Sequence, residues 1–179
     1  NVNLIVVRVQ DYSKDLSIPR GKQYWKPHSE SIFYTGTTGI WQTVWLEALS
    51  DTYIEKIWIT PDLDQKCVTV EYEIKGQCND IILESNVRLA GRTVSKNRFN
   101  VLGNRGKFLI SLDNRYLHYD DIVWYDDIVW SPENPVLFDV NLKLFQADFV
   151  VDNVNSYFGL RKVSIQNGKF MLNNKPYYQ

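Results

Sequence analysis

Regular alternation of apolar and polar residues is the feature that most constrains how this chain can fold. Residues 68–75 carry Val, Val, Tyr and Ile at every second position, with Thr, Glu, Glu and Lys between them. Residues 138–144 repeat the pattern with Phe, Val, Leu and Leu. A period of two is that of a β-strand with one face on a core and the other in water. The chain is therefore expected to build its core from sheets.

Further strands are expected at short intervals along the chain. They fall at residues 53–60, 81–89, 93–100, 108–112 and 162–166. Turn residues separate them at 61–62, 75–76, 103–106 and 166–168. No segment shows a sustained helical period, and short strands with frequent turns favour a sandwich. The predicted fold class is all-β, with a β-sandwich at residues 51–155.

Composition narrows the classes of partner. The 6 Trp, 11 Tyr and 8 Phe could stack on sugar faces, although packing within sheets is the favoured explanation because strands prefer aromatic residues. The net charge is −1, and no run of Lys or Arg is long enough to follow a phosphate backbone. No apolar run is long enough to cross a membrane. Nucleic acid and membrane are therefore not expected as partners.

Two cysteines, Cys67 and Cys78, flank a single predicted strand and its turn. Thiols at such a separation are not expected to form a disulfide, so both are interpreted as free. Free thiols are typical of a reducing compartment, which indicates a cytoplasmic location. Residues 1–9 are interpreted as a strand and lack the pattern of a signal peptide, so the start of the parent protein is expected upstream.

Residues 119–124, Tyr-Asp-Asp-Ile-Val-Trp, are repeated at once as residues 125–130. The repeat length of six residues is even, so the Ile and Trp of both copies lie on the same face of a strand. Either copy can therefore pair with the neighbouring strand, and the other copy then extends that strand, forms a bulge or loops out. Alternation separates Asp120 and Asp126 from Asp121 and Asp127. A calcium site is therefore not expected, and neither is any other metal or cofactor.

Three blocks of sequence occur in a characteristic order. Residues 34–47 are Tyr-Thr-Gly-Thr-Thr-Gly-Ile-Trp-Gln-Thr-Val-Trp-Leu-Glu, and residues 130–140 are Trp-Ser-Pro-Glu-Asn-Pro-Val-Leu-Phe-Asp-Val. Residues 157–163 are Tyr-Phe-Gly-Leu-Arg-Lys-Val, followed at 170–177 by Phe-Met-Leu-Asn-Asn-Lys-Pro-Tyr. Together the blocks resemble glycoside hydrolase family 2, which contains β-galactosidases and β-glucuronidases.

The resemblance implies a domain organisation. Residues 1–50 would be the C-terminal strands of a jelly-roll sugar-binding domain, joined by a long loop at 11–31. Residues 51–155 would be an immunoglobulin-like β-sandwich, and residues 156–179 a connector towards a catalytic (β/α)₈ barrel. The chain would then be a non-catalytic accessory fragment of an enzyme that hydrolyses β-galactosides or β-glucuronides with retention. The alternative is a stand-alone β-sandwich that binds carbohydrate or protein, and the connector at 157–179 argues against it.

No catalytic residue is expected in this chain. Glycoside hydrolysis uses two carboxyl groups around the glycosidic bond, and in the family both are barrel glutamates, one of them preceded by Asn. The sequence holds no Asn-Glu dipeptide, and Glu133-Asn134 is interpreted as a proline-flanked structural turn. His28 and His118 have no neighbours arranged as a triad and are interpreted as surface or packed residues.

One substrate contact is expected, at Glu30. In the family an acidic residue of the jelly-roll loop reaches the sugar, and Glu30 is the acid of the loop at residues 20–31, whose Lys22-Gln23 resembles the Lys-Gln of β-glucuronidases. The alternative for Glu30 is a solvated loop charge. Trp41 and Trp45 share a predicted strand face, where packing is favoured over a sugar platform.

Two surfaces are expected to meet other parts of a larger assembly. Arg161 is expected to pair with a carbonyl or carboxylate at the barrel interface, or else to be a free surface arginine. Residues 1–49 carry strands whose edges lack partners, so they are expected either to pack on the sandwich or to mediate self-association, the second being favoured. A homo-oligomer is therefore possible.

Overall fold

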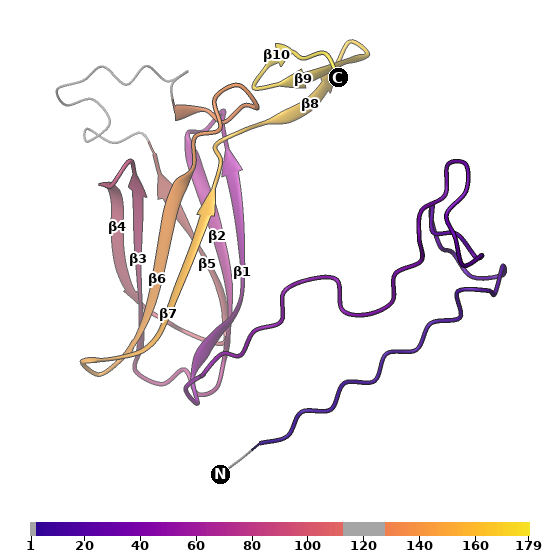
Figure 1. The fold of residues 1–179 in the computed structure, drawn as a ribbon. Helices are drawn as coiled ribbons and strands as arrows, with labels where there is room; N and C mark the ends of the chain where they lie inside the picture. The colour runs from indigo at the N-terminus through magenta and orange to yellow at the C-terminus, as the bar shows by residue number, and fades with distance from the viewer. Residues whose placement is uncertain (1–2, 113–127) are drawn as a thin grey trace. The chain divides into compact units, whose positions relative to one another are not determined.

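The computed structural model describes residues 3–112 and 128–179 and divides into two units, residues 1–47 and 48–179 (Figure 1). The second unit contains ten strands among its described residues. The first seven are β1 (Tyr53–Asp62), β2 (Cys67–Lys75), β3 (Ile81–Leu89), β4 (Arg92–Asn100), β5 (Arg105–Ser111), β6 (Phe138–Gln146) and β7 (Phe149–Phe158). Short strands β8 (Val163–Gln166), β9 (Lys169–Leu172) and β10 (Lys175–Pro176) follow.

Strands β1 to β7 form two antiparallel sheets that face each other (Figure 1). One sheet has the order β1-β2-β5, and the other has the order β4-β3-β6-β7. Strand β1 is tied to the opposite sheet, because the Ile54 amide donates a hydrogen bond of 2.7 Å to the carboxylate of Asp152 on β7. The predicted all-β sandwich is confirmed.

The core lies between the two sheets, where the inward faces of the alternating strands meet. Strand β2 contributes Val68, Val70, Tyr72 and Ile74, and β6 contributes Phe138, Val140, Leu142 and Leu144, all of them buried. The rings of Phe138 and Phe158 stack at 4.9 Å with an angle of 1° between their planes. Burying each large apolar side chain contributes roughly 1.5–3 kcal/mol, so the two predicted alternating runs supply much of the stability of the sandwich.

The strand boundaries agree closely with the sequence pattern. The five further strands predicted at residues 53–60, 81–89, 93–100, 108–112 and 162–166 lie within a few residues of β1, β3, β4, β5 and β8. Strand β7 was not singled out, and it runs past Asn155 to Phe158, so the last strand of the sandwich uses residues that the resemblance assigns to the connector.

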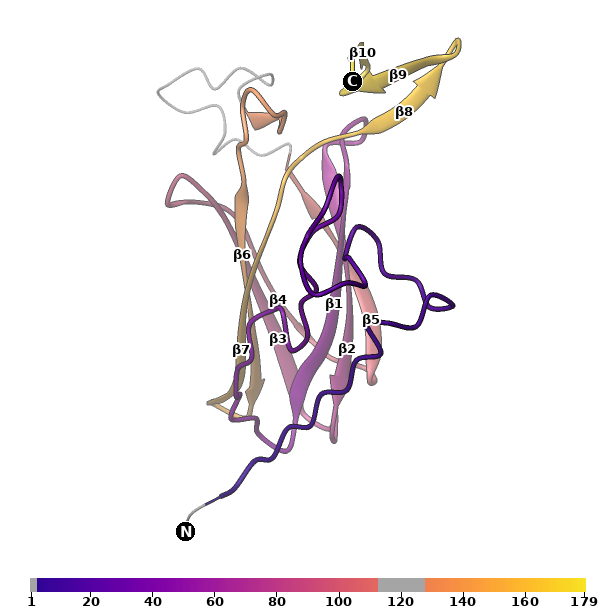
Figure 2. The same ribbon diagram turned by 45° about the vertical axis from the view of Figure 1, so that its right-hand side comes forward.

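A small third sheet of order β8-β9-β10 leaves one end of the sandwich, as Figures 1 and 2 both show. Two-residue turns join its strands. Asn167 and Gly168 have φ values of 51° and 72°, and Asn173 and Asn174 have values of 54° and 62°. Positive φ at both central positions is what tight hairpins require, and Asn and Gly adopt it most readily. The predicted turn at residues 166–168 is confirmed.

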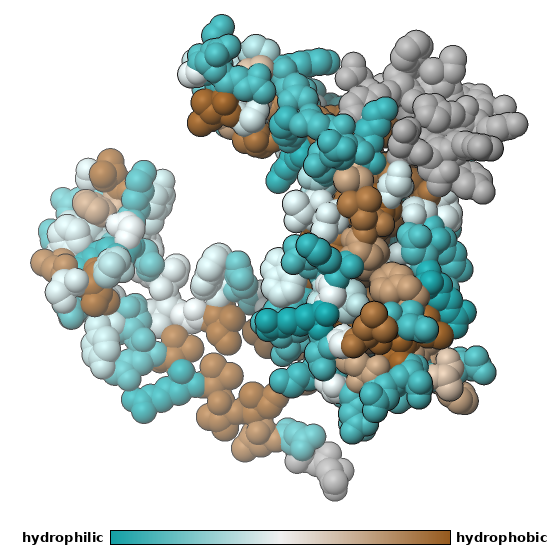
Figure 3. Space-filling view, turned by 180° about the vertical axis from the view of Figure 1, so that it is seen from behind, coloured by the Kyte–Doolittle hydropathy of each residue, from teal (hydrophilic) through white to brown (hydrophobic). Residues whose placement is uncertain are grey.

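The first unit has little regular structure. Within residues 3–47 the hydrogen-bonded pairing is an isolated parallel bridge between Gln23 and Tyr34. Residues 3–9, for which a strand is predicted, form no ladder, because their apolar side chains have no sheet to join in this unit. Apolar residues near the N-terminus are exposed, and they form brown patches beside the grey terminal residues in Figure 3. The assignment of residues 1–50 to a jelly roll stays a prediction.

Other predictions meet the structure at single residues. Cys67 is the first residue of the nine-residue strand β2 and Cys78 follows its end, so the length of the strand, at about 3.3 Å per residue, separates the two free thiols. No helix among the described residues is long and apolar enough to span a membrane. His118 and most of the repeat at residues 119–130 lie outside the described residues.

Candidate functional site

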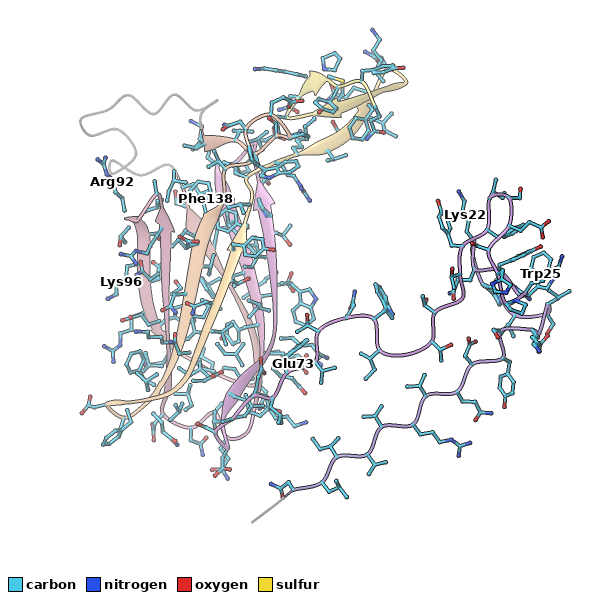
Figure 4. All side chains as sticks on the ribbon, viewed as in Figure 1. Lys22, Trp25, Glu73, Arg92, Lys96 and Phe138 are labelled. Atoms are coloured by element: carbon cyan, nitrogen blue, oxygen red, sulfur yellow. The ribbon has the colours of Figure 1, made fainter. Side chains whose placement is uncertain are left out.

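The loop at residues 20–31 is closed by two backbone hydrogen bonds. The Tyr24 amide donates to the Tyr34 carbonyl, and the Tyr34 amide donates to the Lys22 carbonyl, each at 2.7 Å. Gly21 and Ser31 adopt positive φ values of 61° and 57°, which let the chain bend back at both ends. Lys22 and Trp25 therefore lie together in a compact loop of the first unit (Figure 4).

Three aromatic rings fill the inside of this loop. Tyr24 stacks on Phe33 at 5.1 Å, and Trp25 contacts both rings edge-on at 4.6 and 5.2 Å. The cations of Arg20 and Lys26 lie over the rings of Trp25 and Tyr24 at 5.6 and 5.5 Å. Tyr24 is only 7% exposed. This aromatic cluster gives the loop a small core of its own, worth about 0.5–1.5 kcal/mol per ring pair beyond area burial.

Glu30 is held by the same loop. Its Oε2 accepts a hydrogen bond of 2.7 Å from the Tyr24 hydroxyl and lies 3.5 Å from Nζ of Lys26. The Tyr24 hydroxyl, followed by the charge of Lys26, lowers the pKa of Glu30 below its usual value. The Glu30 side chain is 67% exposed, and Oε1 has no partner among the described residues. Glu30 is therefore an ionised loop carboxylate with one oxygen available to a ligand.

A groove of about 490 Å³ lies on another side of the loop. It is lined by Gln23 and by the residues of the Gly-Ile-Trp motif and their neighbours, namely Thr37, Thr38, Gly39, Ile40 and Trp41. Gln23 Oε1 accepts from the Thr37 amide at 2.9 Å, and the Thr38 hydroxyl donates to Asp11 at 2.8 Å. The structure thus brings Gln23 and the motif together, a pairing that the sequence analysis missed, whereas Glu30 is not part of the lining.

The two tryptophans of the motif segment are exposed. Trp41 is 87% exposed, and the Trp45 indole donates to Glu47 at 3.1 Å. Neither ring is packed into a core within residues 3–47, so the predicted core or interdomain packing of these rings stays a prediction. His28 is exposed on the loop, in agreement with a surface histidine.

At the end of the sandwich, Arg161 stacks on an aromatic ring. Its guanidinium lies 4.7 Å from the ring centroid of Trp130, whose amide donates to the Leu160 carbonyl at 2.9 Å. A Cβ on Gly159 would lie 2.9 Å from Trp130, so only glycine lets the indole approach this closely. Within this chain the observed partner of Arg161 is the Trp130 ring, and the predicted carbonyl or carboxylate partner at the barrel interface stays a prediction.

Residues 162–177, part of the predicted connector, are fastened to the sandwich at several points. Asp64, in the turn after β1, accepts hydrogen bonds from Lys162 and from Asn174, the latter at 3.1 Å. Glu133 accepts from the Tyr177 hydroxyl at 2.8 Å, and Asn173 donates to the Trp130 carbonyl at 2.9 Å. We call these contacts the connector latch.

The partners of both latch carboxylates favour the ionised form. The hydrogen bond from Lys162, then that from Asn174, lowers the pKa of Asp64, and the Tyr177 hydroxyl lowers that of Glu133. The segment at Ser131 to Asn134 is a closed turn, because the two residues exchange backbone hydrogen bonds of 2.9 and 3.1 Å. Glu133-Asn134 is therefore structural, as predicted.

Within residues 3–112 and 128–179, no group of three or more His, Cys, Asp or Glu side chains is arranged to hold a metal ion. Two of the predicted candidate carboxylates have structural partners, Tyr24 for Glu30 and Tyr177 for Glu133, and the four aspartates of the repeat lie outside the described residues.

Comparison with known proteins gives consistent relatives. The profile of Glycosyl hydrolases family 2 matches residues 52–161. The chain is 27% identical over 182 residues to a β-galactosidase of Thermoanaerobacter pseudethanolicus, an alignment covering 97% of this chain and 22% of that protein. It is 26% identical over 152 residues to a β-glucuronidase of Rattus norvegicus, covering 83% of this chain and 21% of that protein.

A solved structure with the same fold is a β-glucuronidase from Ruminococcus gnavus in complex with D-glucaro-d-lactam, with a TM-score of 0.50 at 19% identity. It is matched over 73% of this chain and 20% of its own. The chain thus spans about a fifth of the length of the relatives it matches. Since the family profile covers more than half of its 179 residues, the chain belongs to glycosyl hydrolase family 2.

Proposed function

We propose that this chain is a non-catalytic accessory segment of a family 2 glycoside hydrolase that acts on β-galactosides or β-glucuronides with retention. The observation that carries the proposal is the full-length alignment with about a fifth of a β-galactosidase, supported by a β-glucuronidase over a similar share. A carbohydrate is accordingly the substrate of the intact enzyme. The segment would hold its connector in a fixed position through the connector latch.

The purified chain is expected to release no product from aryl β-galactoside, β-glucuronide or β-mannoside, because the two carboxyl groups that hydrolysis requires would lie in another part of the enzyme. The protein expressed from the complete reading frame is expected to turn over at least one of these substrates. Turnover by residues 1–179 that disappears when one of their carboxylates is mutated would contradict the proposal.

Within the intact enzyme, we propose that Glu30 contacts the sugar through Oε1, with Tyr24 holding Oε2. Glu30→Gln is expected to raise KM at least tenfold with little change in kcat, because a hydrogen bond to a charged group is worth roughly 1.5–3 kcal/mol and is made in ground and transition states alike. Tyr24→Phe serves as the control, since it removes the 2.7 Å bond inside the loop and keeps the carboxylate. Equal effects of both variants would assign Glu30 to loop structure, and unchanged kinetics in both would make it a solvated charge.

A further inference from the structure

The outer face of the β1-β2-β5 sheet carries a groove that the proposed function does not use. Its volume is about 530 Å³, and its side-chain lining comes from all three strands: Lys56, Trp58 and Thr60 from β1, Glu71 and Glu73 from β2, and Arg105 from β5. All of these residues belong to the second unit. Glu71 and Glu73 alternate along β2 with the buried Val70, Tyr72 and Ile74, so the groove faces away from the core.

Trp58 is the unusual member of this surface. Ile57 and Ile59 pack on the core, so the alternation of β1 turns the indole of Trp58 outward, where the residue is 49% exposed. No ring contact or hydrogen bond of the indole occurs among the described residues. A large flat ring that stays half exposed on a sheet offers an apolar face to a ligand, and its N–H group remains available as a donor.

Polar groups are arranged in rows beside the ring. Trp58 pairs across the strands with Glu71, and Lys56 pairs with Glu73, which in turn pairs with Arg105. Neighbouring strands are about 4.8 Å apart, so the polar side chains that lie opposite one another across the strands follow at about that spacing. Arg105 lies 2.7 Å from Glu73, which fixes this second row, whereas Glu71 has no ion pair among the described residues. Acceptors and donors thus stand at fixed places next to an aromatic platform.

The charge of the groove decides the class of ligand. Two lining carboxylates, Glu71 and Glu73, are matched by two lining cations, Lys56 and Arg105, and Lys107, opposite Glu71 on β5, adds a single positive charge beside the groove. A polyanion or a strongly charged protein surface would gain little here. A neutral ligand with an apolar face and many hydroxyl groups, each able to donate and accept, matches the ring and the mixed rows.

We propose that this groove binds a neutral oligosaccharide, stacked on Trp58 and hydrogen-bonded to Glu71 and the Lys56-Glu73-Arg105 row. The site is distinct from the loop at residues 20–31 and does not depend on the proposed function, since it requires no catalytic domain. It would hold a polymeric carbohydrate through the outer face of the β1-β2-β5 sheet.

The test is a titration of the complete 179-residue chain, followed by the indole N–H signals in ¹⁵N NMR spectra. The probes are cellotetraose, xylotetraose, laminaritetraose and β-1,4-galactotetraose, with tetragalacturonate as a charged comparison. The Trp58 signal, assigned by its loss in Trp58→Phe, is expected to shift with at least one neutral probe in the millimolar range. Trp58→Ala should weaken that binding about tenfold, and Glu71→Gln should weaken it severalfold.

Phe149→Ala is the matched control, because Phe149 is an exposed aromatic residue on the other sheet, and it should leave binding unchanged. Thermal unfolding of each variant, compared with that of the unmodified chain, separates loss of binding from loss of fold. No shift with any neutral probe at millimolar concentration would overturn the proposal. So would preferential binding of tetragalacturonate, or a Trp58 shift that follows protein concentration without sugar, which would indicate an interface between copies of the chain.

Discussion

At the scale of single residues, the closest constraints on this fold come from glycines. Gly76 follows β2 with a φ of 102°, and a Cβ built on it would lie 2.2 Å from the Asp51 carbonyl oxygen. The chain entering β1 therefore passes directly over the end of β2. The sequence marks Gly76 as a turn residue, but the carbonyl above it belongs to another part of the chain and is visible only in the structure.

Gly76→Ala is expected to destabilise the sandwich by about 3 kcal/mol, since it combines backbone strain with a clash against main-chain atoms. Urea denaturation followed by circular dichroism measures the change. Gly91→Ala has positive φ but open space, so about 1 kcal/mol is expected. Gly103→Ala has neither constraint and should change stability by less than about 0.5 kcal/mol. Equal losses at all three positions would show that the contact with Asp51 is unimportant.

At the scale of elements, the strands that were easiest to predict are those with an unbroken period. Strand β2 and strand β6 keep every second residue apolar, so their position and inward face could be derived from sequence. Strand β7 could not, because Asp152 lies where the pattern calls for an apolar residue and instead accepts a hydrogen bond from the Ile54 amide. A register shift opposite Leu144 and Phe145 interrupts the period further.

In the candidate site, too, one part could be predicted from the sequence and another part could not. The loop at residues 20–31 and Glu30 could be proposed from the resemblance. The hydrogen bonds of Glu30 to Tyr24 and of Gln23 to Thr37 could not, because they depend on how the chain bends at Gly21 and Ser31. Side-chain partners across an irregular loop carry no periodic signal.

The connector latch is expected to open in acid before the sandwich unfolds. Docking lowers the pKa values of Asp64 and Glu133 from their ordinary 3.8 and 4.5, so the docked form binds fewer protons than the released form. Its contribution is complete above these ordinary values and is lost as the pH falls through the lowered ones. NMR spectra recorded during acidification should show the amide signals of β8 and β9 moving to disordered positions before those of β3 and β6.

Variants of the two carboxylates test this assignment. Asp64→Asn should weaken docking already at neutral pH, and combining it with Glu133→Gln should remove most of the pH dependence of the β8 and β9 signals. The amide signals of all strands could instead lose their chemical-shift dispersion at one pH, with the double variant behaving as the unmodified chain does. In that case Asp64 and Glu133 do not control docking.

At the scale of the whole molecule, the two units differ in how they treat apolar surface. The second unit encloses its apolar side chains between two sheets, whereas in the first unit Leu4, Val6, Trp41 and Leu46 are among many that are exposed. Such surface favours association with another chain.

The 179-residue chain is therefore expected to form dimers or larger species that light scattering detects, and a chain of residues 48–179 to be monomeric. Val6→Lys should lower the average molecular mass that light scattering measures for the 179-residue chain, because a lysine on an exposed extended segment opposes pairing between chains. Val150→Lys, at an exposed position of the sandwich, is the control. A longer chain that is monomeric at every concentration tested would contradict self-association through residues 1–47.

The order of the latch residues along the chain has a consequence for synthesis. Asp64 and Glu133 leave the ribosome before Lys162, Asn174 and Tyr177, which donate hydrogen bonds to them. Strand β7, which completes the second sheet, also comes first. Because domains fold as units from the N-terminus during translation, β8 to β10 meet a finished surface when they emerge. The C-terminal strands can then dock one after another as they are made, without waiting for the sandwich to form around them.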